Sequence, residues 1–410
     1  MPLEIIDQNI FRTICDSVSD KSFMQSVEMG DLLKKRGFQV SYLAFRVDNV
    51  IQVAALLYSL PMTGGYHMEI NSGPISHNQV YLADFYRELK DYAKENGALQ
   101  LLVKPYNTYQ HFNTDGKPTD EAKSQLIESL KGLGYIHDGL LTGYPGGEPD
   151  WHYVKDLTGL NQDNLLKSFS KKGRPLVKKA KTFGMTLRKL KREELHIFKE
   201  ITSDTSNRRD YVDKPLDYYQ DFYDSFGDAC EFMVASLNFQ DYTTNLEKDK
   251  AKLDQKISKL KKDLEMNSGS DKKRNQLREL TSQSATFETR IEEAKTFINK
   301  YGSQDVVLAG SLFIYTKQEA VYFFSGSYPE FNKFYAPAVL QEHAMLEAIK
   351  RGITSYNLLG ITGQFDGSDG VLRFKQNYNG YITRTTGTFR YYPHPFKYKI
   401  IQFIKKLIGR

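Results

Sequence analysis

The chain has 410 residues, 40% of them hydrophobic and 26% charged, which is too long for one ordinary core and long enough for two. Its mean hydropathy of −0.53 and the lack of an apolar run near about 18 residues exclude a membrane-spanning protein. The two cysteines exclude a disulfide framework and a zinc set. The first residues lack a basic segment followed by an apolar one, so we expect a cytoplasmic protein.

Positive charge is concentrated in two places. The formal net charge is +6. Residues 165–192 contain eleven basic side chains and residues 394–410 contain five, with no acid in either stretch, so the rest of the chain carries −10. A mildly acidic body with two positive patches indicates a polyanionic partner.

The first third of the chain is typical of a mixed α/β unit. Strands are expected at 38–47, 50–60 and 66–74, followed by an amphipathic helix at 80–97 and a strand at 98–106. Three consecutive strands that lead to a helix and a further strand follow the order of the acyl-CoA N-acyltransferase (GNAT) fold.

The first basic stretch predicts a binding face for phosphates. Lys171, Arg174, Lys178 and Lys181 share one face of an expected helix, and each is able to neutralise a phosphate. The alternative is a solvated helix face, but acid-free runs of this length favour function. Further on, Arg208 lies beside Arg209 in the polar segment 205–215, where a guanidinium suits a bidentate grip on phosphate. A surface turn explains that segment equally well.

A helical hairpin is expected at 242–300. Apolar residues recur every three or four positions on both sides of the turn formers at 266–271, which predicts two antiparallel helices. The remaining faces are charged, so the hairpin should project from the body as an arm. The seam consists of Leu246, Leu253, Ile257, Leu260 and Leu264, then Leu277, Leu280, Phe287, Ile291, Ala294 and Ile298.

The order of elements repeats around this arm. Strands are expected at 229–237, 306–315 and 320–327, then a helix at 334–352 and a strand at 354–360. A short helix at Gly370–Lys375 and a strand at 383–392 complete this unit. We therefore predict an α/β (α+β) protein with two GNAT-like subdomains and an inserted antiparallel coiled-coil hairpin. Two unrelated α/β domains are the alternative.

The predicted boundaries follow from this repeat. The first subdomain comprises residues 1–157, and the second comprises 158–241 and 301–393. The arm is 242–300, and a basic amphipathic helix occupies 394–410. That helix places Phe396, Ile400, Ile404, Leu407 and Ile408 on one side, so it either lies on an anionic membrane surface or packs against the body.

Several common chemistries find no support in the sequence. The Arg/Gln-x-x-Gly-x-Gly/Ala loop that cradles CoA is absent, and its nearest approach, Gln364–Asp369, ends in the wrong residue. There is no P-loop, no serine-nucleophile motif and no spacing of the eight histidines that suits a metal. We expect no cofactor and no metal.

With these features in place, the chain resembles the Fem/Mur (FemABX) family of peptidoglycan bridge aminoacyltransferases along essentially its whole length. The inserted arm makes it most similar to the MurN and FemA branch. The matching segments are FMQSVEMGDLLKKRG, INSGPI, VKPYNTYQHFNTDGKP, SKKGRPLVKKAKTFG, the Arg208 segment before KPLDYY, the arm, FYAPAVLQEHAM, GVLRFKQNYNG and the basic tail.

The resemblance implies transfer of an amino acid from aminoacyl-tRNA to the bridge peptide of lipid II, without CoA. It implies that the amino acid is alanine, added as the second bridge residue. It also implies that Lys34 or Lys35 and Arg208 contact the diphosphate or nucleotide-like end of the precursor, and that Tyr335 and Pro337 line the cleft. The protein would then work at the inner face of the cell membrane, with the C-terminal helix on the anionic surface.

The resemblance further implies that Phe374 and Lys375 hold the tRNA 3′ end. Some relatives carry Asp-Pro where this chain has Lys104-Pro105, and that carboxylate was a candidate general base. A charged lysine cannot replace it, so we expect catalysis by orientation and by the electrostatics of Lys375. The alternatives are a non-catalytic protein that binds structured RNA and a GNAT-type acetyltransferase.

Overall fold

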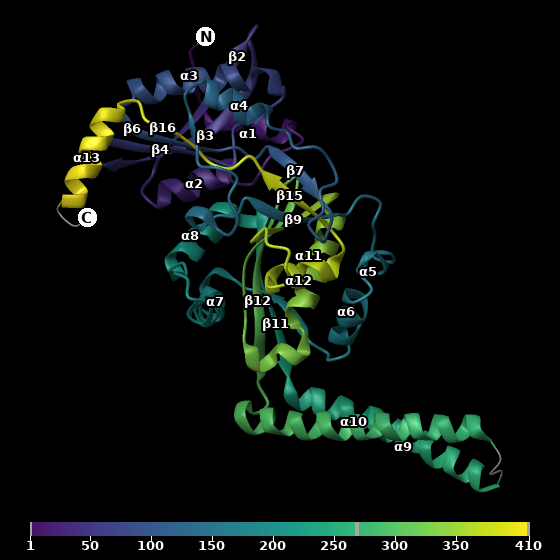
Figure 1. Ribbon diagram of the computed structural model, residues 1–410. Coiled ribbons are helices and arrows are strands. Elements are labelled where there is room, and N and C mark those ends of the chain that lie inside the picture. Colours follow the sequence, from purple (N-terminus) through teal and green to yellow (C-terminus); the bar gives the residue numbers. More distant parts are fainter. Residues whose placement is uncertain (1, 267–269, 408–410) are drawn as a thin grey trace.

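The computed structural model describes residues 2–266 and 270–407 and contains two eight-stranded sheets, one above the other in Figure 1. Helices cover both faces of each sheet, and a long helical arm extends from the far end. The mixed α/β class and the paired subdomains agree with the prediction. Within the described residues, no helix is both long enough and apolar enough to cross a membrane.

The first sheet has β4 and β6 as a parallel pair at its centre. The two strands are paired from Tyr66↔Ala98 to Asn71↔Lys104, with one register shift between Tyr66 and His67. The helices α1 (Gln8–Ser17) and α2 (Val27–Lys35) cover one face, and α3 (Leu82–Glu95) and α4 (Gln125–Gly132) cover the other. The strand order is β1 (Glu4–Ile6), β2 (Gln39–Val47), β3 (Val50–Met62), β4 (Gly65–Asn71), β6 (Ala98–Lys104), β16 (Phe389–Tyr391) and β8 (Ile136–His137), with β5 (Ile75–Ser76) beside β3.

The second sheet is covered by α7 (Leu195–Arg209) and α8 (Leu216–Phe226) on one face. The helices α6 (Gly173–Lys181) and α11 (Ala336–Lys350) cover the other face. Its strand order is β10 (Thr186–Lys189), β11 (Cys230–Asn238), β12 (Asp305–Tyr315), β13 (Ala320–Ser327), β14 (Ser355–Ile361), β9 (Trp151–Asp156), β15 (Tyr381–Thr385) and β7 (Thr108–Phe112).

Three hydrophobic cores hold these layers together, and the middle one joins the subdomains. It packs one face of each sheet together with α1, α2, α7 and α8. The strand β3 shows why the sequence is apolar without alternation. Ala54 and Leu56 enter the middle core, whereas Val53, Ala55 and Leu57 enter the outer one, because both faces of the sheet are buried.

The two sheets exchange strands across the predicted boundary at residue 157. The strands β7 and β9 precede this boundary but belong to the second sheet, and β16 follows it but belongs to the first. The strand expected at 383–392 is in fact β15 and β16, separated at Gly387, whose φ of +80° interrupts an extended strand. This exchange ties the subdomains together and sets the walls of the junction between them.

The arm lies between β11 and β12, as predicted. It consists of α9 (Phe239–Met266) and α10 (Asp271–Tyr301), and its tip at 267–269 is outside the described residues. At its base Phe297 is buried 4.5 Å from the ring of Phe239, so Phe297 takes the place expected for Ile298, which is only half-buried. The aromatic rings of Phe331 and Phe334 complete this anchor.

Candidate active site

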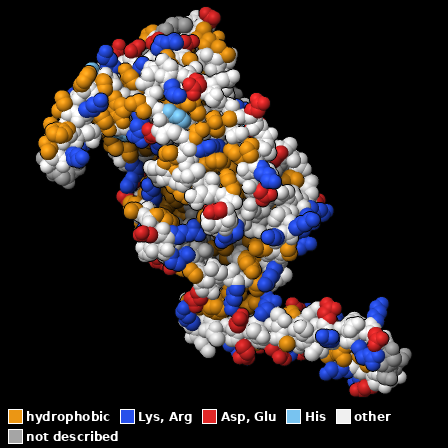
Figure 2. Space-filling view, viewed as in Figure 1, with side chains coloured by type: hydrophobic (Ala, Val, Ile, Leu, Met, Phe, Trp, Pro, Cys, Tyr) orange, Lys and Arg blue, Asp and Glu red, His pale blue; other side chains and the backbone are white. Residues whose placement is uncertain are grey.

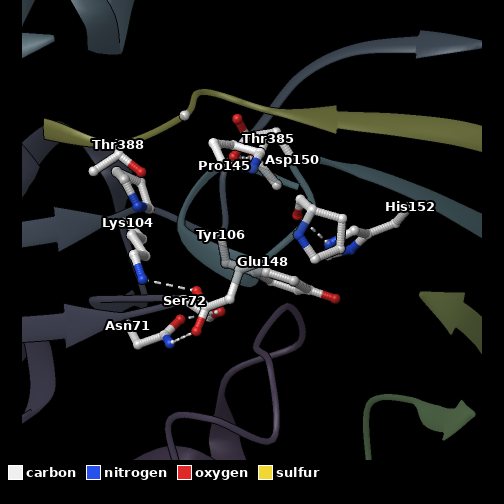
Figure 3. A pocket seen from close by; sticks show the side chains of 13 residues that line it. Asn71, Ser72, Lys104, Tyr106, Pro145, Glu148, Asp150, His152, Thr385 and Thr388 are labelled. Atoms are coloured by element: carbon white, nitrogen blue, oxygen red, sulfur yellow. Dashed lines mark hydrogen bonds and ion pairs between the residues drawn. The ribbon is translucent and has the colours of Figure 1, made fainter. Parts of the chain in front are cut away.

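A cavity of about 40 Å³, large enough for two or three water molecules, lies at the junction of the two subdomains (Figure 3). Its lining comes from 71–72 and 104–106 after the parallel strands of the first sheet, and from 145–152 and 385–388 beside the second. The carboxyl ends of adjacent parallel strands are a common place for ligand sites in α/β proteins. Both subdomains therefore supply its polar groups.

An ion-pair network crosses this junction. The Lys104 Nζ lies 2.9 Å from Glu69 and 2.8 Å from Glu148, and the Asn71 amide donates to the second oxygen of Glu148 at 2.9 Å. Burial opposes the charge on Lys104, but Glu148 and Glu69 hold its pKa above the ordinary value. Burial alone would raise the pKa of Glu69, yet hydrogen bonding from His67 and the Lys104 charge lower it to about 2. Lys104 is thus a fixed cation.

The second subdomain opens where its own parallel strands separate. The strands β13 and β14 are paired only at Ala320↔Tyr356 and Val321↔Asn357 and then diverge. Just beyond this point Leu359 adopts a left-handed φ of +56°, and the pairing of β14 with β9 is irregular. In the first subdomain β4 and β6 stay paired up to their carboxyl ends at Asn71↔Lys104, so these two strands do not diverge in the same way.

Lys375 lies against this opening. It ends α12 (Gly370–Lys375), is 3% exposed, and its Nζ donates to the carbonyls of Leu359 at 2.9 Å and Gly360 at 2.6 Å. Burial lowers its pKa to about 7, and Asp369 opposes that shift only in part. An ammonium has three donors, so these two carbonyls leave one of them unused.

His152 connects Lys375 with the junction cavity. It lines the cavity and is paired with Gly360 across β9 and β14, next to the carbonyls that hold Lys375. Burial and, to a smaller extent, the nearby charge of Lys375 lower the pKa of His152 to about 4. His152 is therefore neutral, and Lys375 lies just behind the cavity wall.

The predicted tRNA face lies directly beside this lysine. The amide of Ser170 donates to the carbonyl of Asn377 at 3.0 Å, and a Cβ at Gly173 would lie 1.9 Å from that same carbonyl oxygen. Only glycine allows this approach, so α6 begins against the segment that follows Lys375. Figure 2 shows Lys and Arg side chains gathered over this part of the body.

The four predicted basic residues of that face are not equivalent. Lys171 and Lys178 are exposed, whereas Lys181 pairs with Glu342 at 3.0 Å. Arg174 is half-buried and donates to the carbonyl of Lys167. Lys181 is also exposed, but its ion pair leaves Lys171 and Lys178 with the least competition for a phosphate.

Phe374 and the FYAP segment lie near the same region. The Phe374 ring is half-buried against Tyr378, with centroids 5.5 Å apart. Tyr335 has a left-handed φ of +54° immediately before α11, and Pro337 occupies its first turn. The Lys179 ammonium lies 5.5 Å from the Tyr335 ring, which links the FYAP segment with α6.

The predicted diphosphate contacts lie on the other side of the second sheet. Lys34 and Lys35 occupy the last turn of α2, where Lys34 lies 3.5 Å from Asp31 and Lys35 is exposed. Arg208 donates to the carbonyl of Ser327 at 2.8 Å, at the end of the diverging strand β13. Among the described residues that line the junction cavity, none is a predicted substrate-binding residue.

Arg209 is the second arginine of this segment. Its charge acts on the hydroxyls of Tyr144 and Tyr322, and it opposes the rise in pKa that burial causes at both. The Tyr144 hydroxyl in turn donates to the carbonyl of Gly360 at 3.3 Å. The sequence shows this arginine only as one of a pair. Glu148 and His152 were not candidates in the sequence analysis, because neither residue belongs to a recognisable motif.

Comparisons with known proteins agree with this architecture. Two aminoacyltransferases FemA from Staphylococcus aureus, of strains bovine RF122 / ET3-1 and N315, are each 29% identical over 388 residues, with 92% of both chains covered. The names of these relatives confirm the expected enzyme class. The crystal structure of FemX matches with a TM-score of 0.76 at 20% identity, covering 98% of this chain and 100% of that one, and confirms the fold. The FemAB family model matches residues 6–406, and the chain therefore belongs to the FemAB family.

Proposed function

We propose that the chain transfers alanine from alanyl-tRNA to lipid II, as the second residue of the peptide bridge of peptidoglycan. The observation that carries this proposal is the position of Lys375. Its buried amine lies behind a two-subdomain cavity, beside the basic helix α6. Membership of the FemAB family and the name of the FemA relatives support aminoacyl transfer as the class of reaction.

The reaction is aminolysis of an ester. The free amine of the acceptor peptide attacks the ester carbonyl, a C–N bond forms, and the C–O bond to the ribose breaks. The ribose oxygen leaves with a proton that the amine gives up. The remaining donor of Lys375 stabilises the developing oxyanion, and the junction cavity orients the amine.

The two substrates approach from different sides in this proposal. Lys171, Arg174, Lys178 and Lys181 contact tRNA phosphates, and Phe374 stacks on a base at the 3′ end, next to Lys375. Lys34, Lys35 and Arg208 hold the diphosphate of lipid II, with Tyr335 and Pro337 along the cleft. The second sheet separates Lys34, Lys35 and Arg208 from the basic helix α6, whereas Tyr335 lies on the α6 side. This arrangement suits a polyanion on one side and the diphosphate of a lipid-linked precursor on the other.

The C-terminal helix supports work at the inner membrane surface. In α13 (Pro395–Leu407) one side packs on the body, because Ile401 lies against Gly64. Three apolar side chains on the helix remain 82%, 64% and 70% exposed, namely Phe396, Phe403 and Leu407. Figure 2 shows this apolar surface with lysines beside it. Such a face suits the headgroup layer of an anionic membrane on the cytoplasmic side.

A transfer assay with purified components tests the proposal. Labelled alanyl-, seryl- and glycyl-tRNA are incubated separately with the protein and with lipid II that carries zero or one bridge residue. We expect transfer of alanine to the acceptor with one bridge residue. RNA binding without transfer would indicate a non-catalytic RNA-binding protein, and activity with acetyl-CoA alone would indicate an acetyltransferase.

A further inference from the structure

Asn357 occupies the point at which β13 and β14 separate. It is 1% exposed and belongs to the last pair of the two strands, Val321↔Asn357. Its Oδ1 accepts a hydrogen bond of 2.8 Å from the amide of Leu359, the residue with the left-handed φ of +56°. A leucine rarely adopts that conformation without support. The side chain of Asn357 thus stabilises the turn in β14.

This turn holds Lys375. The Lys375 Nζ donates to the carbonyls of Leu359 and Gly360 at 2.9 and 2.6 Å. Leu359 is the residue whose amide is bonded to Asn357, and Gly360 follows it. A buried ammonium depends on such acceptors, since water does not reach it. The direction of these two carbonyls therefore fixes the position of the amine.

A buried carboxyl group in turn holds Asn357. The Asn357 Nδ2 donates to Glu319 Oε2 at 3.0 Å and to the Tyr106 hydroxyl at 3.1 Å, and that hydroxyl donates to the same Oε2 at 2.9 Å. Glu319 comes from the turn between β12 and β13 in the second subdomain, whereas Tyr106 follows β6 in the first and lines the junction cavity. The network spans both subdomains.

The hydrogen bonds that the Glu319 carboxyl group accepts come from Asn357 and Tyr106, which are neutral groups. Its Oε1 has no hydrogen-bond partner among the described residues, and burial raises its pKa to about 7 against the hydrogen bonds from Asn357 and Tyr106. Asp20 adds to that rise and Lys21 opposes it, from the segment after α1. A costly buried carboxyl at the apex of the opening is typical of functional sites.

We propose that Glu319 and Asn357 are positioning residues for aminoacyl transfer, because they fix the turn of β14 that holds the Lys375 amine behind the junction cavity. This inference rests on the proposed role of Lys375. It assigns Glu319 and Asn357 no contact with either substrate. Loss of either side chain lets the carbonyls of Leu359 and Gly360 turn away and releases the amine.

The test compares four variants of the full chain. Glu319→Leu and Asn357→Leu remove the network, Glu319→Gln keeps an acceptor oxygen, and Gln318→Leu is the matched control. Gln318 belongs to the same turn and donates to the carbonyls of Cys15 and Val18, but it does not contact Asn357. The two network variants should lower kcat about 10- to 100-fold, with each KM within about twofold of the original. Glu319→Gln and Gln318→Leu should keep kcat within about twofold.

A second readout needs no substrate. Competitive acetylation with acetic anhydride, followed by mass spectrometry over a range of pH, gives the pKa and the reactivity of the Lys375 amine. Both should rise in the network variants, because the released amine reaches water. Unchanged acetylation in Glu319→Leu and Asn357→Leu would overturn the inference, as would an equal change in Gln318→Leu. If the leucine variants do not fold, Tyr106→Phe provides the comparison, with a loss in kcat of about threefold expected and unaltered kcat and acetylation contradicting the inference.

The two readouts separate the inference from the proposed function. If the unmodified protein transfers no alanine while acetylation of Lys375 still depends on Glu319, the proposed function is wrong and the positioning network stands. If transfer occurs and neither readout depends on Glu319 or Asn357, the proposed function stands and the positioning network is wrong.

Discussion

The Nζ of Lys104 lies 2.8 Å from the Glu148 carboxylate and joins the end of β6 to the segment that enters β9. The pair bridges the strands of the first sheet and those of the second at the edge of the junction cavity. A cation thus occupies the position at which the family resemblance suggested a carboxylate base. Glu148 and Glu69 hold the pKa of Lys104 above its ordinary value, which keeps this side chain protonated and does not suit it to act as a general base.

Replacement of Lys104 by methionine should weaken the junction. The variant leaves the buried Glu69 without its ammonium, and we expect the free energy of unfolding at neutral pH to fall by about 2 kcal/mol. Because the folded-state pKa of Glu69 is about 2, below the ordinary 4.5, its contribution is present above pH 4.5 and is lost as the pH falls toward 2. Urea unfolding at several pH values should show that the free energy of unfolding of the unmodified protein falls toward acid pH. The same dependence should be weaker in Lys104→Met.

The matched control is Lys131→Met, which removes an exposed lysine that pairs with Glu128 within α4 at 3.4 Å. A surface ion pair of this kind contributes little to stability, so the free energy of unfolding should change by less than about 0.5 kcal/mol. If Lys104→Met and Lys131→Met lost the same free energy of unfolding, the ion-pair network at the junction would contribute no more to stability than a surface pair does.

The transfer rate should depend on the charge of Lys375. Burial lowers the pKa of this amine to about 7, so the ammonium predominates below pH 7 and is lost as the pH rises through it. We expect kcat to decline above about pH 7, and Lys375→Arg, if active, to retain its rate to higher pH because a guanidinium stays charged. Initial rates at saturating substrate between pH 5.5 and 9 measure this, with Lys350→Arg on the exposed end of α11 as the control. A flat profile in the unmodified protein would contradict electrostatic catalysis by Lys375.

Charge on α6 should govern affinity for tRNA. Lys178→Ala removes an exposed cation, so KM for alanyl-tRNA should rise and the salt dependence of binding should fall by about one phosphate contact. Lys181→Ala is the matched variant on the same helix, and its effect should be smaller because Glu342 already pairs with that lysine. Filter binding across a salt series gives, for each variant, the slope of the logarithm of the binding constant against the logarithm of the salt concentration. Identical slopes in Lys178→Ala and the original would remove α6 from the RNA surface.

The exposed face of α13 should bind anionic membranes. Phe396→Asp and Phe403→Asp each place a negative charge on that face, and co-sedimentation with phosphatidylglycerol vesicles should fall by about tenfold or more. Val212→Asp, at a side chain that is 95% exposed elsewhere on the surface, is the control and should bind as the original does. Binding that survives both phenylalanine substitutions would show that α13 is not the membrane contact.

Sequence periodicity predicts the large elements of this molecule well. The arm, the repeated order of strands and helices and the C-terminal helix follow from patterns of apolar residues that each element needs in order to bury one face. The strand exchange does not follow from such patterns. The strands β7, β9 and β16 are short, and their partners are set by contacts between residues more than 200 positions apart, as in Ile382↔Phe112.

The site was predictable only in part for the same reason. Basic residues on one helix face are visible in the sequence, and so is the Phe374–Lys375 pair. The roles of Glu148, His152 and Asn357 depend on how strands far apart in the sequence pair and diverge, which no local motif records. Likewise, the sequence does not show that Lys181 is paired with Glu342 or that Lys375 is buried.

Single-turnover transfer by Lys375→Ala provides the most direct test of the proposed chemistry. Lys375→Ala and the original protein are purified and assayed separately, each in excess over labelled alanyl-tRNA, with lipid II that carries one bridge residue. The labelled product is followed over time. We expect the rate of the original to exceed that of Lys375→Ala by about 100-fold or more, with tRNA affinity changed far less. Equal rates in the two proteins would contradict the role of Lys375 and, with it, the proposed mechanism.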